Sequence, residues 1–396
     1  MKTKPHIPKV AILLNAKLDW GRNIINGILD YAQETGPWKV WLRRDAPNIF
    51  HHLPENWEGD GVIARVSTES LAAEMTERGI PYVNVDDNPL PDLPAPSFFT
   101  DDKAGTCMAA ELFIEKGFRT IAFVGSIQKP TNLRYTLSFK EALTGYDIPC
   151  HFFEITPDWS SAQNELRAWL LQLPKPAGLL CLGINGASRI VNQCNELGIS
   201  VPHDIAILAS NDDQIGCHSC FPPLSGIISP TEQIGYRAAA KLHRLMQGEP
   251  MKAEAVYIPP PGIVERLSTD TLAVDDPRLI KAMQFIKEHA FEPITMDDIL
   301  KVVPMSRRSL ERRFAAVFKH SPNHEIRRLR MNRAKELLAE TDLPMADIAE
   351  ACGYSSYNYL SHAFRNATGM APQPTENSFS NPKSTHPDGR AGSAVP

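Results

Sequence analysis

Long apolar runs are scarce in this 396-residue sequence. Runs such as Val10–Leu14 and Ile205–Ala209 fall far short of a membrane-spanning helix, which needs about 18 residues. The first residues, from Met1 to His6, lack the pattern of a cleaved signal peptide. The seven cysteines are scattered except for one close pair, so they do not form a disulfide framework. These absences predict a soluble cytosolic protein.

The close pair, Cys217 and Cys220, encloses His218 in a spacing that zinc sites use. No second cluster of cysteine and histidine completes a tetrahedral site. We therefore expect no metal and no other cofactor, and a zinc site at this pair is the alternative.

Enzyme motifs are absent as well. The sequence has no G-x-x-x-x-G-K-[ST] loop, no G-x-G-x-x-G segment after Leu14 and no G-x-S-x-G nucleophile elbow. The acidic pairs Asp101–Asp102 and Asp212–Asp213 have two interpretations, a metal site in an enzyme or the caps of helices. We predict that the chain is not an enzyme, and a nucleotide-using enzyme is the alternative.

Charge is distributed unevenly along the chain. Residues 1–276 carry 24 basic and 33 acidic side chains, a net charge of −9, whereas residues 277–376 carry 15 basic and 12 acidic side chains, a net charge of +3. A basic segment attracts anions such as nucleic acid. Nucleic acid is therefore a candidate partner of the C-terminal third alone.

Up to about residue 270, apolar strand-like runs alternate with amphipathic helical segments. The predicted strands are 10–14, 38–42, 61–64, 81–85, 121–125, 179–182 and 205–208. Short continuous apolar runs are typical of parallel strands that are covered on both faces. The alternation is too long for one sheet and restarts near Phe118, so we predict a two-lobed α/β domain. A ligand cleft is expected at the carboxyl ends of its strands.

From Pro277 onward the pattern is helical, and one unit occurs twice, at 296–314 and at 345–364. Each copy has a short helix, a tight turn with a serine suited to N-capping, and a second helix with Leu and Phe four residues apart. Pro304 in the first turn cannot adopt the left-handed conformation of a turn glycine, which puts this turn in doubt. An all-α domain with two helix-turn-helix units is predicted.

The second helix of each copy is expected to enter a DNA major groove, because that groove admits an α-helix. The DNA-binding candidates are the polar residues on the outward faces of these helices: Arg307, Arg308, Glu311, Arg312, Tyr357, Asn358, Ser361, His362 and Arg365. Two alternatives stay open. The arginines also fit a solvated cationic face with an ion pair to Glu311, and Asn358 either pairs with adenine or bonds its own backbone at the helix start.

Several segments resemble known families. This sequence is similar to the effector domain of LacI/GalR-type regulators at residues 99–102, 115–125, 197–207, 222–227 and 264–269. The duplicated unit resembles the AraC/XylS-type DNA-binding domain, and so do the segments 328–338, 348–354, 364–365 and 369–372. These resemblances imply a periplasmic-binding-protein-like effector domain at 8–270, a linker at 271–277 and an AraC-type DNA-binding domain at 278–376. The composition of 377–396 predicts a disordered tail.

The order of the two domains, with the effector domain first, resembles the xylose operon regulators. The resemblance implies a sugar effector, xylose or a related compound, between the lobes. The candidate ligand-binding residues are Trp20, Arg22, Arg134, Tyr135, Asn185, Ser210, Asn211 and Asp212. Core packing is the alternative role for Trp20.

Three positions depart from the sugar-binding pattern of the family. Ser210 and Ile184 stand where the family has aspartate, and Tyr135 stands where it has arginine, although Arg134 is adjacent. Buried polar groups and ligand hydroxyls must match one another. We therefore expect an effector that is less hydroxylated than xylose or differently polar, or a domain that no longer senses a sugar.

These observations predict a sequence-specific transcription regulator that binds a double-stranded DNA operator under the control of a small molecule. The AraC-type resemblance favours an activator that contacts RNA polymerase, and a homodimer, but the sequence does not determine the sign of regulation. A sugar-binding domain without a regulatory role is the alternative, and it leaves residues 277–376 without an explanation.

Overall fold

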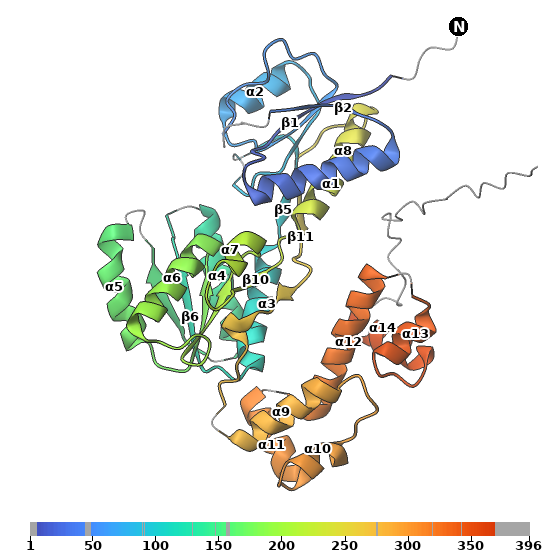
Figure 1. The fold of residues 1–396 in the computed structure, drawn as a ribbon. Coiled ribbons are helices and arrows are strands. Elements are labelled where there is room, and N and C mark those ends of the chain that lie inside the picture. Colours follow the sequence, from blue (N-terminus) through green and yellow to red (C-terminus); the bar gives the residue numbers. More distant parts are fainter. Residues whose placement is uncertain are drawn as a thin grey trace, which may run out of the picture. The chain divides into compact units, whose positions relative to one another are not determined.

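The computed structural model describes residues 6–43, 49–88, 90, 92–128, 130–146, 148–155, 159–274, 276–318, 320–341 and 343–368. The chain divides into two compact units, Met1–Asp275 and Asp276–Pro396 (Figure 1). The first unit contains two α/β lobes and the second is helical, which confirms the predicted fold class. Among the described helices, none is long and apolar enough to cross a membrane. The predicted tail at 377–396 lies outside the described residues.

The first lobe is built on a sheet of six parallel strands, in the order β11-β5-β4-β3-β1-β2. Their bounds are Glu254–Ile258 (β11), Pro96–Thr100 (β5), Tyr82–Asn84 (β4), Gly61–Ala64 (β3), Lys9–Leu13 (β1) and Lys39–Leu42 (β2). Val10 and Ile12 of β1 pack with α1 (Asp19–Thr35) and α8 (Thr231–Met246), whereas Ala11 and Leu13 pack on the side of α2 (Glu69–Glu77). Both faces of the sheet are therefore covered, as the apolar runs predict.

Helix α8 and strand β11 belong to this first lobe although they follow the second lobe in the sequence, a return that the alternating pattern did not predict. Close packing of α8 on α1 holds this returning segment in the first lobe. A Cβ atom on Gly27 would lie 1.9 Å from the carbonyl oxygen of Glu232, and one on Gly235 would lie 2.0 Å from that of Ile24. Only glycine allows the two helix backbones to approach this closely.

The second lobe has a six-stranded sheet in the order β12-β10-β9-β8-β6-β7, in which only the short strand β12 is antiparallel to its neighbour. The strands are Ile263–Val264 (β12), Ser225–Ile227 (β10), Ile205–Ala209 (β9), Ala177–Cys181 (β8), Thr120–Gly125 (β6) and Cys150–Glu154 (β7). The helices are Asp102–Glu115 (α3), Pro130–Thr144 (α4), Trp159–Gln172 (α5), Ile184–Leu197 (α6) and Gln214–His218 (α7), followed later by the 3-10 turn η1 (Leu267–Thr269). The chain crosses between the lobes after β5, after β10 and after β11 (Figure 1).

The second unit consists of helices α9 (Pro277–His289), α10 (Met296–Val302), α11 (Arg307–Phe318), α12 (Pro322–Glu340), α13 (Met345–Ala351) and α14 (Tyr357–Thr368). The pairs α10/α11 and α13/α14 are the two predicted helix-turn-helix units. Leu310 and Phe314 of α11 are fully buried, as is Leu360 of α14. The Oγ atom of Ser306 accepts the backbone N–H of Ser309 at 3.3 Å, so this serine caps α11 as predicted.

The two turns are closed in different ways. In the second helix-turn-helix, between α13 and α14, Gly353 adopts φ +73°, and a Cβ atom there would lie 2.7 Å from the carbonyl oxygen of Phe291. In the first helix-turn-helix, between α10 and α11, Val303 is extended (φ −122°, ψ 117°) and its carbonyl oxygen accepts the N–H of Met305 at 2.8 Å. Pro304 is therefore accommodated because this turn needs no left-handed residue at its position.

Candidate functional site

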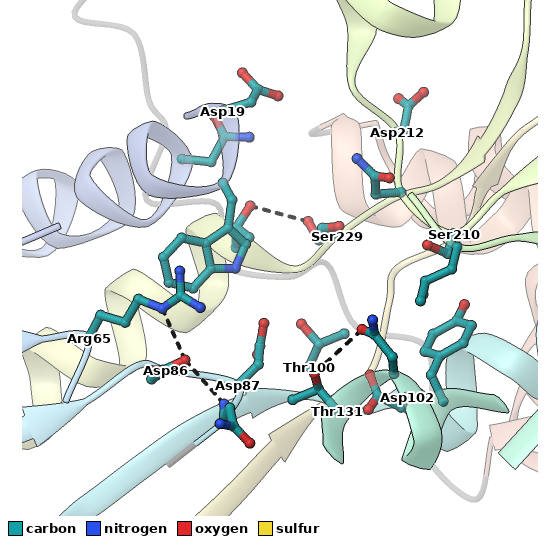
Figure 2. Close-up of a pocket in the computed structure, with 18 of the residues that line it drawn as sticks. Asp19, Arg65, Asp86, Asp87, Thr100, Asp102, Thr131, Ser210, Asp212 and Ser229 are labelled. Carbon is teal, nitrogen blue, oxygen red and sulfur yellow. Dashed lines mark hydrogen bonds and ion pairs between the residues drawn. The ribbon is translucent and has the colours of Figure 1, made fainter. Parts of the chain in front are cut away.

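A cavity of about 1240 Å³ lies between the two lobes of the first unit. Its wall includes residues that follow β3, β4 and β5 in the first lobe and β8 and β9 in the second lobe. All of these are carboxyl ends of parallel strands, where the alternating pattern placed the cleft. Figure 2 shows Asp86 and Asp87 on one side of the cavity and Ser210 and Asp212 on the opposite side.

The structure brings most of the predicted ligand-binding residues into the wall of this cavity: Trp20, Arg134, Tyr135, Ser210, Asn211 and Asp212. Two others are placed elsewhere. Arg22 donates to the carboxylate of Asp19 at 2.7 Å and to the carbonyl oxygen of Lys17 at 2.9 Å. Asn185 is exposed in the first turn of α6 and is not among the residues that line the cavity.

On the side of the first lobe, an ion pair stands at the ends of β3 and β4. The Nε atom of Arg65 donates to Oδ1 of Asp86 at 3.0 Å, and its guanidinium group lies 5.5 Å from the ring centre of Trp20. The Asp86 side chain is 1% exposed. Buried Asn84 accepts the backbone N–H of Asp86 at 3.0 Å, so the turn after β4 is held by hydrogen bonds. Both charged side chains are thus fixed before any ligand binds.

On the side of the second lobe, the predicted residues are largely engaged with the protein itself. The guanidinium group of Arg134 donates to Oδ2 of Asp102 at 2.9 Å. Ser210 Oγ and Asn211 Oδ1 accept the backbone N–H groups of Gly183 and Ile184 at 2.8 and 2.9 Å. The last two bonds satisfy donors at the start of α6, where the backbone N–H groups have no intrahelical partner.

Some polar atoms of the cavity wall lack a partner in the described part of the chain. Trp20 Nε1, Asp86 Oδ2 and Tyr135 Oη are buried and form no hydrogen bond there. A buried polar atom without a partner costs about 1–3 kcal/mol, which a ligand can recover by bonding it. Burial also raises the pKa of Asp102, and burial together with the neighbouring carboxylates of Asp102 and Asp86 raises that of Asp87 to about 6.

Arg65, Asp86, Asp87 and Asp102 are cavity residues that the sequence interpretation did not name as ligand-binding. The signal was present, because each follows a predicted or observed strand within three residues of its end. The rule that ligands bind at the carboxyl ends of parallel strands selects such residues.

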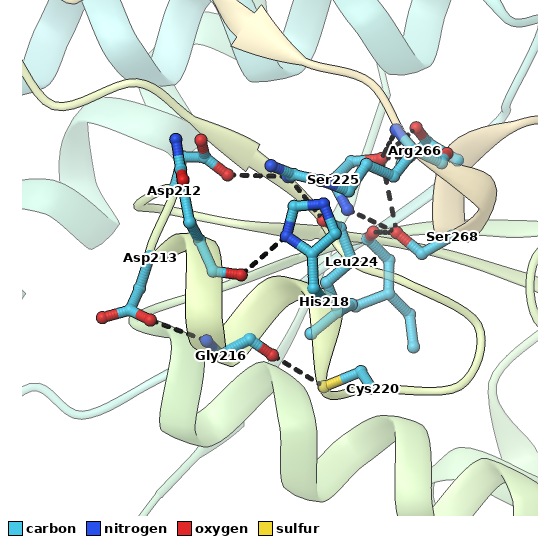
Figure 3. Close-up of polar contacts among 12 residues, drawn as sticks. Asp212, Asp213, Gly216, His218, Cys220, Leu224, Ser225, Arg266 and Ser268 are labelled. Carbon is cyan, nitrogen blue, oxygen red and sulfur yellow. Dashed lines mark hydrogen bonds and ion pairs between the residues drawn. The ribbon is translucent and has the colours of Figure 1, made fainter.

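A buried ion pair links the cavity to the end of the first unit (Figure 3). The Nη1 atom of Arg266 donates to Oδ1 of Asp212 at 2.6 Å and to the carbonyl oxygen of Leu224 at 2.8 Å. The Arg266 and Asp212 side chains are 11% and 9% exposed. The backbone N–H of Arg266 donates to Ser225 Oγ at 2.8 Å, and Ser268 Oγ donates to the carbonyl oxygen of Ile207 at 2.6 Å.

The Cys-x-x-Cys pair lies in the same region. Cys217 and Cys220 are buried, and burial raises the pKa of the Cys217 thiol to about 12. The ring of His218 contacts the carbonyl oxygen of Gln214 at 2.7 Å. Within the described residues, no group of three or more His, Cys, Asp or Glu side chains is arranged to hold a metal ion.

In the second unit, the predicted DNA-binding residues lie on α11 and α14. The exposed ones are Arg307, Arg308, Arg312, Tyr357, Asn358, His362 and Arg365, while Glu311 and Ser361 are half-buried. The Nε atom of Arg307 donates to Glu311 at 3.0 Å, which is the ion pair of the alternative interpretation. Arg308 and Arg312 are one helical turn apart and are both exposed.

The two helix-turn-helix units are held together by Arg330 of α12. Its Nε and Nη2 atoms donate to the carbonyl oxygens of Ala290 and Glu292 at 2.7 and 2.6 Å, at the end of α9. Its guanidinium group also lies 5.9 Å from the ring centre of Tyr354, in the second turn. One side chain therefore joins the α9–α10 segment to the turn between α13 and α14.

Three family descriptions match successive parts of the chain. The XylR N-terminal domain matches residues 9–90, the periplasmic binding protein-like domain matches 110–269 and the helix-turn-helix domain matches 299–378.

Full-length relatives share this arrangement. The xylose operon regulatory protein of Escherichia coli K12 is 28% identical over 384 residues, which cover 94% of this chain and 97% of the relative. A solved structure described as the xylose-binding transcription activator xylR matches with 28% identity and a TM-score of 0.58, covering 94% of this chain and 98% of that one.

The ribose-bound LacI family regulator of Enterococcus faecium has 23% identity and a TM-score of 0.54, and its match covers 67% of this chain and all of that one. At this identity the match supports the fold of the first unit alone. The chain is a transcription regulator that joins a periplasmic-binding-protein-like effector domain to an AraC-type helix-turn-helix domain, and it resembles the xylose operon regulatory proteins over nearly its whole length.

Proposed function

We propose that this regulator binds a small sugar-like effector in the cavity between its lobes and an operator on double-stranded DNA with α11 and α14. The observation that carries the proposal is the presence of two helix-turn-helix units, each with an exposed polar helix face, in one chain with a two-lobed domain whose cavity contains buried unpaired polar atoms. The effector domain spans 8–270 and the DNA-binding domain 278–376, with 271–277 as the linker. The chain acts in the cytoplasm, where its operator is, and catalyses no reaction.

Closure of the lobes on the effector is the regulatory step. Asp212 lines the cavity and is paired with Arg266, which begins the segment that leads through η1 to the second unit. Closure that moves Asp212 therefore acts on this segment, and a ligand shifts the equilibrium by the difference in its affinity for the two states. The active form is a homodimer that activates transcription through contact with RNA polymerase.

The effector is xylose or a compound related to it, and the wall of the cavity favours the related compound. Ser210, which stands where the family pattern has aspartate, accepts the backbone N–H of Gly183 and so has less capacity than an aspartate to accept hydroxyl hydrogens. The neighbouring Asn211 Oδ1 likewise accepts the N–H of Ile184. Calorimetric titration of the full chain with xylose tests this point. A saturable heat at micromolar affinity would show that xylose itself is accommodated.

DNA recognition is tested by selecting binding sites from random duplexes and measuring affinity by fluorescence anisotropy. The double variant R308A/R312A is expected to lose affinity for the selected site by about tenfold or more, because each arginine contacts a base edge or a phosphate. The matched control R237A removes an exposed arginine of α8 in the other unit. Enrichment of no sequence by the full chain, with or without sugar, would contradict the proposed function.

A further inference from the structure

The cavity wall is acidic beyond what its own arginines neutralise. Its carboxylates are Asp19, Asp86, Asp87, Asp102, Asp212 and Glu232, and its guanidinium groups are those of Arg65 and Arg134. Each arginine is already committed to one carboxylate, Arg65 to Asp86 and Arg134 to Asp102. The charge of each guanidinium group is therefore already balanced by a carboxylate of the wall.

Asp87 is the carboxylate of the inner wall that is paired with neither of these arginines. Asp19 is paired with Arg22, Asp212 with Arg266, and Glu232 is exposed. Asp87 has no hydrogen-bond or ion-pair partner among the described residues of the chain. Figure 2 shows its carboxylate at the cavity between Asp86 and Asp102, and both of these carboxylates raise its pKa.

A second unpaired acceptor comes from the neighbouring residue. Asp86 Oδ2 is buried without a hydrogen-bond partner in the described part of the chain, although Oδ1 of the same carboxylate accepts from Arg65 and from the backbone N–H of Asn88. The turn after β4 thus presents two carboxylates to the cavity, with unfilled acceptor capacity on each. Asp86 has a counter-charge in Arg65, but Asp87 has no ion-pair partner among the described residues, and taking a carboxylate out of water without one is costly.

We propose that the effector is a hydroxylated ligand that also carries a protonated amine, such as an amino sugar, and that Asp87 together with Asp86 receives the amine. This inference rests on the proposed function, because it specifies the ligand of the same cavity. An ammonium group has three N–H donors, no acceptor and a positive charge, so it satisfies both carboxylates at once. A hydroxyl group has a single donor and leaves the charge of Asp87 in place.

The remaining unpaired atoms suit the hydroxylated part of such a ligand. Trp20 Nε1 is a donor, and the Tyr135 hydroxyl both donates and accepts. These atoms are neutral, and they lie in the same cavity wall as the carboxylates. The ligand therefore pairs one cationic end with the turn after β4 and offers hydroxyl groups to the aromatic residues.

The test is calorimetric titration of the full chain with matched pairs that differ only in the amine, glucosamine against glucose and galactosamine against galactose, with glucuronate as an anionic probe. We expect an amino sugar to bind at least about tenfold more tightly than its neutral parent, the size of a charge-assisted contact. Asp87→Asn is expected to lower the amino-sugar affinity and abolish this preference. The control Glu77→Gln, an exposed carboxylate on α2, is expected to keep it.

A pH series supplies a readout that a loss of folding does not imitate. The groups that face Asp87 are the carboxylates of Asp86 and Asp102 and the guanidinium groups of Arg65 and Arg134. Because the pKa of Asp87 is raised to about 6, the free protein carries it protonated below that pH, and amino-sugar affinity is expected to fall as the pH is lowered from about 7 to 5. The affinity for a neutral sugar is expected to change much less.

The outcomes separate the two proposals. Equal or tighter binding of the neutral parents, tight binding of glucuronate, or an unchanged preference in Asp87→Asn would overturn the amine while leaving a sugar-responsive regulator intact. No saturable heat with any sugar of either series would overturn the amino-sugar ligand, and the proposed function would then be decided by the titration with xylose and the selection of DNA sites.

Discussion

Replacing Arg266 with alanine is expected to destabilise the first unit by about 3 kcal/mol. The substitution leaves the Asp212 carboxylate without its partner at 2.6 Å and the carbonyl oxygen of Leu224 without its donor. Removing one member of a buried ion pair costs about 3–5 kcal/mol, since the remaining charge is buried and unpaired. The lower end applies here, because Asp212 borders the cavity and water reaches it once the arginine is gone.

Tryptophan fluorescence measures this effect selectively. All six tryptophans lie within the first unit, so a urea or thermal transition followed by their emission reports on that unit in the full chain. A loss of about 3 kcal/mol lowers the thermal midpoint of a domain of this size by about 6–12 °C.

The matched control is Arg244→Ala, which breaks the ion pair with Glu249. The Arg244 side chain is 60% exposed, and exposed pairs contribute about 0–1 kcal/mol. A double-mutant cycle with Asp212→Ala isolates the coupling, and the double variant is expected to be less destabilised than the sum of the two single variants. If Arg266→Ala costs no more than Arg244→Ala, the pair is not an energetic link between the cavity and the end of the unit.

Three further predictions concern the two units separately. R308A/R312A is expected to weaken operator binding and to make it less sensitive to salt. The slope of log affinity against log salt should decrease by up to about 2, because counterion release scales with the number of phosphate contacts. An unchanged slope and affinity would show that neither residue belongs to the interface. Gly353→Ala is expected to destabilise the second unit by about 1–3 kcal/mol, since φ is +73° and the new Cβ atom would meet the carbonyl oxygen of Phe291. Far-ultraviolet circular dichroism would then record an earlier helix transition, while the transition in tryptophan emission stays unchanged. Asp87→Asn is expected to raise the free energy of unfolding more at about pH 7 than at about pH 4. Because the pKa of Asp87 is raised in the folded state, that state binds the proton more tightly, and the wild-type chain loses stability as the pH rises from about 4 to 6. Urea titrations that show the same gain at both pH values would refute this.

Local patterns predicted the elements of this protein well. The apolar runs from Val10 and from Ile205 form buried parallel strands, because a strand covered on both faces must be apolar at every position. The Leu–Phe spacing placed Leu310 and Phe314 on one buried helix face, and the outward arginines followed from the same periodicity. Such inferences need only the geometry of a single element.

Which residues line the cavity depends on which strand ends lie next to one another. Arg65, Asp86 and Asp102 belong to three separate segments, and only the parallel order β5-β4-β3 brings their turns to one edge. Similarly, the family resemblance and their place after a strand made Ser210 and Asn211 ligand candidates, whereas the fold gives them backbone N–H groups at the start of α6 as partners. Hydrogen-bond partners are set by neighbours in space, which periodicity does not report.

Residue order alone therefore determined the classes of element, their alternation and the duplicated helical unit, because periodic burial is a property of each segment by itself. Tertiary structure decided that α8 returns to the first lobe, that Arg330 joins the two helix-turn-helix units and that Asp87 lines the cavity without a hydrogen-bond or ion-pair partner among the described residues. These three features depend on close approaches between segments far apart in the chain, such as the crossing at Gly27 and Gly235. Such approaches are selected by the packing of the whole molecule.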